Sequence, residues 1–321
     1  MQLSSSLVPL SPSVCLADDP ILPPPAWVAD LLDRSARWDM HPIPAGAGFS
    51  IEITPGDHFC LASLRIREAR QLGRAALHEA TARAYRCLEA ELRLRGARHP
   101  VRLWNHIPGI HDPMGEGQDR YMAFNAGRYE ALSEWFGGQE SFDTRVASAS
   151  GIGHDGQDLV IHCLASDRSG QAVDNPRQVA PWRYSRKYGP LPPCFARATV
   201  IHPPGGSPLV LVGGTASIVG EESVHLGDLE RQTEETLTNL AVLVRAAAGD
   251  SAARNLDRAA ALACYRELRV YYPDPERLEE LQDLLADAFP GGTIEWVRAD
   301  LCRAELLVEI EGVAGLDTRL G

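Results

Sequence analysis

The sequence of 321 residues has little that would suit an exported, membrane-spanning or disulfide-bonded protein. Its seven cysteines are odd in number, widely scattered and never arranged as C-x-x-C, which argues against a disulfide framework and against a zinc site. The N-terminus has no basic segment followed by an apolar core, and no uncharged apolar run is long enough to cross a bilayer. We therefore expect a cytoplasmic protein that is not associated with a membrane.

The short motifs of several large enzyme classes are also missing. There is no G-x-G-x-x-G after a strand, no P-loop, no H-E-x-x-H and no G-x-S-x-G, and the histidines do not cluster at metal-ligand spacing. We expect no metal and no cofactor. With 31 Lys and Arg against 43 Asp and Glu, the net charge of -12 disfavours nucleic acid as a partner. A small anionic substrate remains possible, because a few arginines in one pocket act at short range.

Composition and local pattern divide the chain into three parts. Hydrophobic residues make up 45% and charged residues 23%, which is ordinary for a globular protein, and the length favours two domains. Residues 1–48 are rich in Pro and Ser and predict an extended arm with a short helix near Trp27–Trp38. Residues 49–145 predict a first domain: two strands, a helix from Gly73 to Arg95, the strand VRLWNHIPGI and a second helix that ends at a Gly pair.

Residues 146–321 predict a second domain in the order β-β-α-β-α-β-β, which includes two hairpins, a helix from Asp228 to about Ala247 and the closing strand ELLVEIEGV. Helix and strand follow in the same order in each half, which indicates two copies of one α/β unit. The alternative is that any two α/β segments share this order. The predicted fold class is α/β (α+β), with mixed sheets packed against helices.

Residues 175–199 are denser in Arg and aromatics than their surroundings and contain five prolines. A restricted loop loses less entropy when it closes around a ligand, so this segment, with Tyr188, predicts a binding loop; a solvated basic loop is the alternative. Arg197 differs from the other loop arginines because it is the polar position of an apolar strand and needs an anionic partner there. Gly213 and Gly214 interrupt another apolar strand and indicate a bulge or the close approach of another group.

Glu309 lies between Val308 and Ile310 in the last strong strand and shares its face with Leu307. A carboxyl group among apolar side chains has a raised pKa and can keep its proton near neutral pH, as a general acid must. The alternative is that Glu309 or Glu311 pairs with an arginine.

Longer strings of sequence add a family resemblance. The run LVLVGGTASIVGEESVHLGDLERQTEETLTNLAVLVRAAAG and the later LLVEIEG resemble the YjgF-like superfamily of reactive-intermediate deaminases. Further segments, which cover much of residues 100–311, are similar to the chorismatases, including those that make 3-hydroxybenzoate. They are VRLWNHIPGI, DRYMAFNAGRYEA, NPRQVAPWRYSRKYGPLPPCFARAT, GTASIVGEESVHLGD and CRAELLVEIEG. The part before about Gly48 has no counterpart.

The resemblance implies two tandem YjgF-like, chorismate-mutase-like units and a pocket in the C-terminal domain that binds chorismate without metal or nicotinamide. The family's acid glutamate falls on Glu309, and Arg197 and Arg303 match the groups that hold the substrate's carboxylates. Ala216 and Cys302 fall on positions that distinguish products. Alanine at the first resembles the hydrolytic subgroup and cysteine at the second the benzoate-forming one.

We therefore predict an enzyme of secondary metabolism, a lyase or hydrolase, that releases pyruvate and a hydroxybenzoate: 3-hydroxybenzoate, with or without 4-hydroxybenzoate. A hydrolytic chorismatase that leaves a dihydroxycyclohexadiene carboxylate is the first alternative. An imine-hydrolysing deaminase and a non-catalytic small-molecule binding protein on the same fold are the others. Because units of the superfamily pack three together, both a monomer and a homotrimer are compatible with the sequence.

Overall fold

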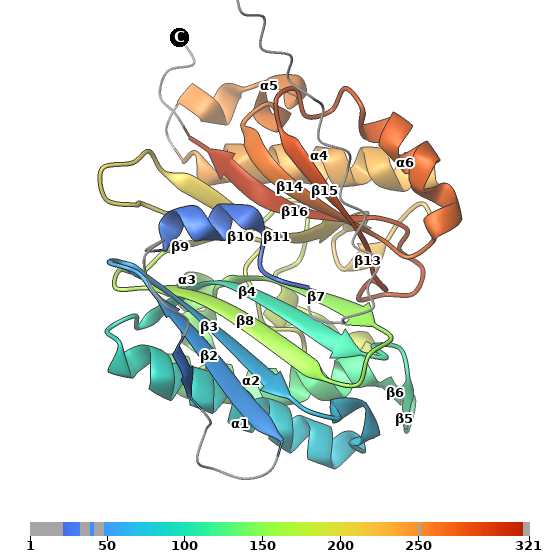
Figure 1. The fold of residues 1–321 in the computed structure, drawn as a ribbon. Coiled ribbons are helices and arrows are strands. Elements are labelled where there is room, and N and C mark those ends of the chain that lie inside the picture. The colour runs from blue at the N-terminus through green and yellow to red at the C-terminus, as the bar shows by residue number, and fades with distance from the viewer. Residues whose placement is uncertain (1–21, 33–38, 42–47, 250–251, 317–321) are drawn as a thin grey trace, which may run out of the picture.

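Two six-stranded sheets face each other in the computed structural model, and each carries helices on its outer side (Figure 1). The structure describes residues 22–32, 39–41, 48–249 and 252–316. The first sheet has the strand order β1-β2-β3-β8-β4-β7, and the second has the order β15-β14-β16-β11-β10-β9. Among the described helices, none combines the length and the apolar character that a bilayer span needs.

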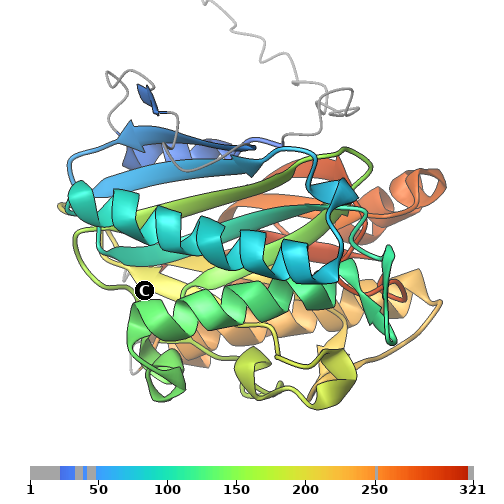
Figure 2. The same cartoon turned by 90° about the horizontal axis from the view of Figure 1, so that it is seen from below.

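The first sheet and its two long helices form one unit. Helices α1 and α2 lie side by side on its outer face (Figure 2). Helix α2 begins where the side chain of Asp119 accepts a hydrogen bond from the backbone N–H of Met122 and ends at Gly137, which has a φ of 78°. The elements are β1 (Asp39–His41), β2 (Phe49–Pro55), β3 (Phe59–Ile66), η2 (Ala69–Gln71), α1 (Arg74–Leu94), β4 (His99–Pro108), β5 (Pro113–Gly115), β6 (Gln118–Asp119), α2 (Arg120–Phe136), η3 (Gln139–Ser141), α3 (Phe142–Arg145), β7 (Ser148–His154) and β8 (Leu159–Ser166).

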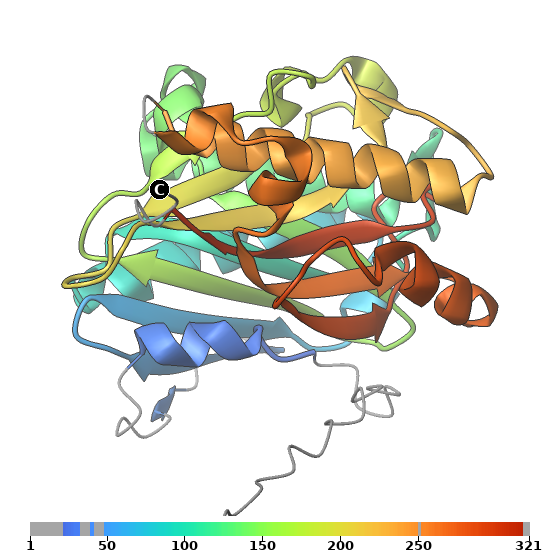
Figure 3. The ribbon, with the colours of Figure 1, turned by 90° about the horizontal axis from the view of Figure 1, so that it is seen from above.

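The second sheet is covered by α4 along its outer face, with α5 and α6 beside it (Figure 3). Asp228 caps α4 by accepting a hydrogen bond from the N–H of Arg231, as its place before an apolar-periodic run predicts. The elements are β9 (Gln171–Val173), η4 (Pro181–Arg183), η5 (Arg186–Tyr188), β10 (Ala198–Ile201), β11 (Leu209–Ala216), β12 (Ile218–Val219), β13 (Glu222–Ser223), α4 (Leu229–Ala247), η6 (Ala252–Asn255), α5 (Arg258–Leu262), β14 (Tyr265–Tyr272), η7 (Pro275–Arg277), α6 (Leu278–Leu285), β15 (Thr293–Arg298) and β16 (Glu309–Gly315).

Strand pairing confirms that the two halves are copies of one unit. In the first, the strands lie in the order β2-β3-β8-β4-β7; in the second, the order is β10-β11-β16-β14-β15, with corresponding strands in corresponding places. Each unit also has one parallel pair at the same location, β4 with β7 and β14 with β15. The mixed α/β class predicted from the sequence is therefore confirmed.

The sheet membership of β7 and β8 differs from the predicted domain boundary. The sequence analysis placed residues 146–166 at the start of the second domain, but β8 pairs with β3 and β4, and β7 pairs with β4. A hairpin's local pattern does not reveal which distant strands it will hydrogen-bond, so the pattern alone could not assign it. By strand pairing, the first unit extends to Ser166 instead of ending at residue 145.

The described part of the N-terminal arm lies between the units. Its short helix η1 (Ala26–Leu31) buries Trp27 and Val28 against inward-facing residues of both sheets. The carbonyl of Leu22 accepts a hydrogen bond from His162 of β8, and that of Pro23 accepts one from Arg269 of β14. The predicted helix near Trp27–Trp38 is thus a single 3-10 segment, and residues 33–38 lie outside the described ranges. Strand β1, within the predicted arm, pairs with β2.

Candidate active site

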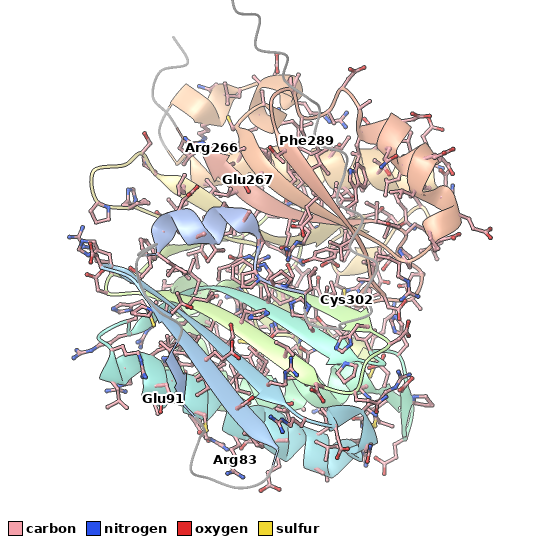
Figure 4. The ribbon with its side chains drawn as sticks, in the orientation of Figure 1. Arg83, Glu91, Arg266, Glu267, Phe289 and Cys302 are labelled. Atoms are coloured by element: carbon pink, nitrogen blue, oxygen red, sulfur yellow. The ribbon has the colours of Figure 1, made fainter. Side chains whose placement is uncertain are left out.

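A cavity of about 290 Å³ lies between the two units, and all seven residues predicted for the site line it. Gly214 and Ala216 come from β11, Glu309 from β16, Cys302 and Arg303 from the segment before β16, and Tyr188 and Arg197 from the loop before β10. Figure 4 shows Cys302 at the level where the two sheets face each other. The sequence prediction placed the pocket in the C-terminal domain, whereas its opposite wall belongs to the first unit, chiefly to α2 and β7.

Glu309 is the first residue of β16 and is only 3% exposed. Burial raises the pKa of its carboxyl to about 8, and the neighbouring carboxylate of Glu311 acts in the same direction. Arg102, Arg197 and the thiol of Cys302, whose sulfur lies 3.9 Å from Oε2, oppose this shift in pKa. Because the pKa of Glu309 lies above neutrality, the carboxyl keeps its proton at neutral pH and can serve as a proton donor.

The two glycines of β11 make room for this carboxyl group. A Cβ on Gly214 would lie 1.9 Å from Oε1 of Glu309, and one on Gly213 would lie 2.7 Å from the carbonyl oxygen of Ala149 in the other unit. The β11–β16 register shifts between Val212 and Thr215, so the glycines also form a bulge. Both interpretations of the glycine pair, a bulge and a close approach, are therefore confirmed.

The two interpretations of the last strand apply to two different glutamates. Glu311 pairs with Arg102 at 2.6 Å, while Glu309 has no ion pair among the described residues. The expectation that Leu307 shares the face of Glu309 is wrong. Regular pairing of β16 begins only at Glu309, and Leu307 packs with the cluster on the helix side of the sheet. The apolar surroundings that raise the pKa of Glu309 therefore come from other elements.

Arg197 is buried and has no carboxylate partner within the described ranges. Its Nη2 donates to the hydroxyl of Tyr184 and, at 3.4 Å, to the carbonyl of Val179, while its Nε has no hydrogen-bond partner. A buried guanidinium with a free donor needs an acceptor that is not part of the described chain. An anionic ligand in the cavity would supply it.

Two other arginines of the binding loop are already paired. Arg177 lies 2.7 Å from Glu235, and the exposed Arg183 lies 2.9 Å from Asp143, so both hold the loop in place. Arg303 stacks on the ring of Tyr188, with its central carbon 3.9 Å from the ring centroid. It donates to the carbonyl of Glu221 and to the hydroxyl of Ser223, with no carboxylate in ion-pair range in the described structure. Its charge, like that of Arg197, is available to a ligand.

Comparison with known proteins agrees with this geometry. A family model described as "Chorismatase FkbO/Hyg5-like, N-terminal" matches residues 38–165, which covers most of the first unit. A 3-hydroxybenzoate synthase of Streptomyces hygroscopicus is 35% identical over 240 residues, 73% of this chain and 69% of the relative. A chorismatase of the same species is 32% identical over 275 residues, 85% of this chain and 76% of the relative. The chain belongs to the chorismatase family.

The fold agrees as well. A chorismatase crystal structure at 1.08 Å resolution superimposes with a TM-score of 0.71 and 30% identity, over 86% of this chain and 80% of that one. The chorismatase resemblance recognised in the sequence is therefore confirmed for both family and fold. The matched family region ends at residue 165, one residue before the end of β8, which agrees with the boundary given by strand pairing.

The chorismatase cavity also contains residues that sequence reasoning missed. Arg128 of α2 is buried, donates to the carbonyl of Cys194 at 2.6 Å and leaves its Nε without a partner. Tyr121 of the same helix and Ser150 of β7 line the cavity too, and burial raises the pKa of the Tyr121 hydroxyl. One signal was present: Arg128 lies in DRYMAFNAGRYEA, one of the strings that resemble the family. Its position opposite Glu309 depends on how the units pack.

Two alternative chemistries, a thiolate nucleophile and a metal centre, find no support among the side chains of the cavity. Burial and the nearby Glu309 raise the pKa of the Cys302 thiol to about 12, so little of it is thiolate at neutral pH, and thiolate is the nucleophilic form. Within the described residues, no group of three or more His, Cys, Asp or Glu side chains is arranged to hold a metal ion. The functional groups of the cavity that remain for chemistry are thus the buried carboxyl of Glu309 and several guanidinium groups.

Proposed function

We propose that the cavity binds chorismate and that the protein removes its enolpyruvyl side chain as pyruvate. Chorismate carries two carboxylates and an enol ether. Arg128, Arg197 and Arg303, all without carboxylate partners in the described structure, supply the guanidinium groups that hold the carboxylates. Aromatic side chains such as Tyr121 and Tyr188 flank the ring. A dianionic substrate of this size would satisfy the buried donors that the protein leaves free.

The reaction begins with proton transfer from Glu309 to the terminal methylene carbon of the enol ether. The carbon that carries the ether oxygen becomes oxocarbenium-like, and the carboxylate now on Glu309 stabilises that positive charge. Water adds to this carbon, its proton returns to Glu309, and the resulting hemiketal collapses to pyruvate and a ring alcohol. The water oxygen ends in pyruvate, and the ether oxygen stays on the ring.

The observation that carries this proposal is a buried carboxyl group with a raised pKa, in one cavity with arginines that have no carboxylate partner among the described residues. A glutamate in water is ionised at neutral pH and has no proton to give. Burial of Glu309, in a space that Gly214 leaves open, provides that proton inside a cavity of suitable charge.

For the product, we propose a hydroxybenzoate. Loss of the second ring hydroxyl as water aromatises the ring, so pyruvate and hydroxybenzoate together have the composition of chorismate. Support comes from Cys302, whose sulfur lies beside Glu309 at the cavity wall, and from the 3-hydroxybenzoate synthase among the relatives. Ala216, also in the wall, resembles the hydrolytic subgroup, so the dihydroxycyclohexadiene carboxylate is the second candidate product.

The test incubates the purified, metal-stripped protein with chorismate and follows pyruvate and the ring products by chromatography. We expect pyruvate and 3-hydroxybenzoate in equal amounts from the wild type, and none above background from Glu309→Gln. Glu279→Gln, the same change at an exposed site on α6, is the control and is expected to behave like the wild type. Absence of pyruvate with the wild type would refute the activity, and chorismate binding under those conditions would indicate the non-catalytic binding protein.

A further inference from the structure

A buried hydrogen-bond network joins the two units directly behind the acid. Glu311 of β16 accepts from Nη2 of Arg102 at 2.6 Å, from Nε1 of Trp104 at 2.8 Å and from the hydroxyl of Ser150. The side chains of Arg102 and Glu311 are each 1% exposed. All three donors belong to the first unit, on β4 and β7, whereas the acceptor belongs to the second. The network therefore connects the units through one carboxylate.

This network lies next to the reacting group in two ways. Glu311 follows Glu309 by two residues on a strand, so both side chains point to the same face of the sheet, toward the other unit. Ser150 lines the cavity opposite Glu309, and it also accepts from Nη2 of Arg102. The strand that carries the acid and the facing wall of the cavity are thus tied to each other at Glu311.

We propose that Glu311 is a positioning residue for Glu309: it places a fixed negative charge beside the acid, which keeps the proton on it, and holds its strand against the opposite wall. The proposal rests on the proposed function, because it takes Glu309 as the proton donor. Glu311 is suited to this role since a guanidinium and two further donors, all from the other unit, hold its side chain in place. Its own partners leave it no free oxygen to act on a substrate.

The charges around Glu309 determine in which direction its pKa should change when Glu311 is replaced. Glu311 raises the pKa of Glu309, and Arg102, on the other side of the ion pair, lowers it by less. Other titratable groups around Glu309 are Arg197 from the binding loop, Cys302 from the segment before β16, Tyr121 and Arg128 from α2, and Tyr271, its register partner on β14. Of these groups, Glu311 makes the largest contribution to the raised pKa.

Glu311→Gln should therefore lower the pKa of Glu309 and shift the alkaline limb of the pH–activity profile to lower pH. Two unit charges this close predict a shift on the order of one pH unit. Glu311→Asp retains the charge and should leave the limb near its wild-type pH, even if its geometry lowers kcat. Glu134→Gln, which removes one carboxylate from an exposed ion pair with Arg86, is the control and should not move the limb.

Glu311→Gln leaves Arg102 buried without a counter-charge and can fail to fold. The double variant Arg102→Met with Glu311→Gln removes both charges and avoids that cost. Because Glu311 affects Glu309 more than Arg102 does, the limb should still move to lower pH, by less than in the single variant. A limb at or above the wild-type pH in the double variant would overturn the proposal.

The decisive measurement does not require turnover. Carbon-13 NMR of glutamate-labelled protein, with the Glu309 signal assigned by its loss in Glu309→Gln, gives the titration of Glu309 directly. A lower midpoint in the folded Glu311 variants supports the positioning role, and an unchanged midpoint refutes it, whether or not the wild type releases pyruvate. Absence of pyruvate from the wild type refutes only the proposed function.

Discussion

The two units share one backbone pattern, so their residues can be compared position by position. Each has a register shift at the same place, between Pro100 and Arg102 in β4 and between Tyr265 and Glu267 in β14. When the two units are aligned at this register shift, Leu164 of β8 corresponds to Val313 of β16, and both are buried between the sheets. The positions of the polar residues near the site correspond in the same way: Glu311 to His162, Glu309 to Val160, Arg269 to Trp104, and Tyr271 to His106.

The difference lies in which unit carries the acid. Where the second unit has Glu309, the first has Val160, which is buried like its counterpart. The first unit instead supplies the facing wall and its cation, Arg128, and the donors that hold Glu311. The comparison teaches that a duplicated fold has produced one asymmetric site: one copy holds the proposed proton donor, and the other completes the cavity around it.

The largest effect should come from a glutamate introduced into the first unit at the position that corresponds to Glu309. Val160→Glu places a carboxyl group at a buried position between His106 of β4 and Arg65 of β3, and Arg65 is already paired with Asp158. We expect a loss of about 3 kcal/mol or more in the free energy of unfolding and no second activity. Urea unfolding and pyruvate release per chain measure these effects, with Val160→Gln as the uncharged control. Doubled turnover would show that the units are functionally equivalent.

The next prediction concerns the space that Gly214 leaves for the carboxyl group of Glu309. Gly214→Ala should displace the carboxyl of Glu309, because the new Cβ would lie 1.9 Å from Oε1. A displacement of this kind typically costs about 100-fold in kcat. Gly206→Ala, where the nearest atom would lie 3.6 Å away, is the matched control. Unaltered turnover in a folded Gly214→Ala protein would contradict the role of this glycine.

A smaller effect measures what the first unit contributes to substrate binding. Arg128→Met should raise KM for chorismate by about 10-fold or more, since a charge-assisted hydrogen bond contributes about 1.5–3 kcal/mol. We expect kcat to change less, because the acid is untouched. Arg98→Met, at an exposed arginine of the same unit, should leave both constants as they are. If KM is unaffected in Arg128→Met, the second unit binds the substrate alone.

The smallest expected effect is the change in the free energy of unfolding with pH. The folded protein holds the proton of Glu309 up to about pH 8, whereas the unfolded chain loses it near the ordinary value of 4.5. The free energy of unfolding should therefore fall as pH rises between these values, by at most about 1.4 kcal/mol per pH unit from this group. Denaturation curves of wild type and Glu309→Gln at several pH values isolate its share. Parallel curves would show that Glu309 is ionised in the folded state.

Much of the fold could be predicted from local signals. The helix from Gly73 to Arg95 and the one that follows Asp228 agree with α1 and α4, because apolar periodicity and caps are properties of short stretches. The seven site residues all line one cavity, since family strings identify residues whatever their distance in space. Their individual roles remain predictions.

What the sequence did not reveal is set by contacts between distant elements. The sheet to which β7 and β8 belong depends on strands that pair far along the chain. Arg128 and Ser150 become part of the site only when α2 and β7 face the second unit. The start of β16 at Glu309 likewise depends on its partner strands, because ELLVEIEGV has apolar residues on both sides of that point.

The segment Leu22–Leu32 has a consequence for the order of events during synthesis. It leaves the ribosome before everything it contacts, and the residue that binds the carbonyl of Pro23 follows 246 positions later. The ring of Trp27 lies 5.9 Å from that of Trp104 in the first unit, and its buried cluster also includes Val313, near the end of the described chain. Full burial of this tryptophan therefore requires both units, and we expect nascent chains that stop before β16 to leave it more exposed to water than the full chain does.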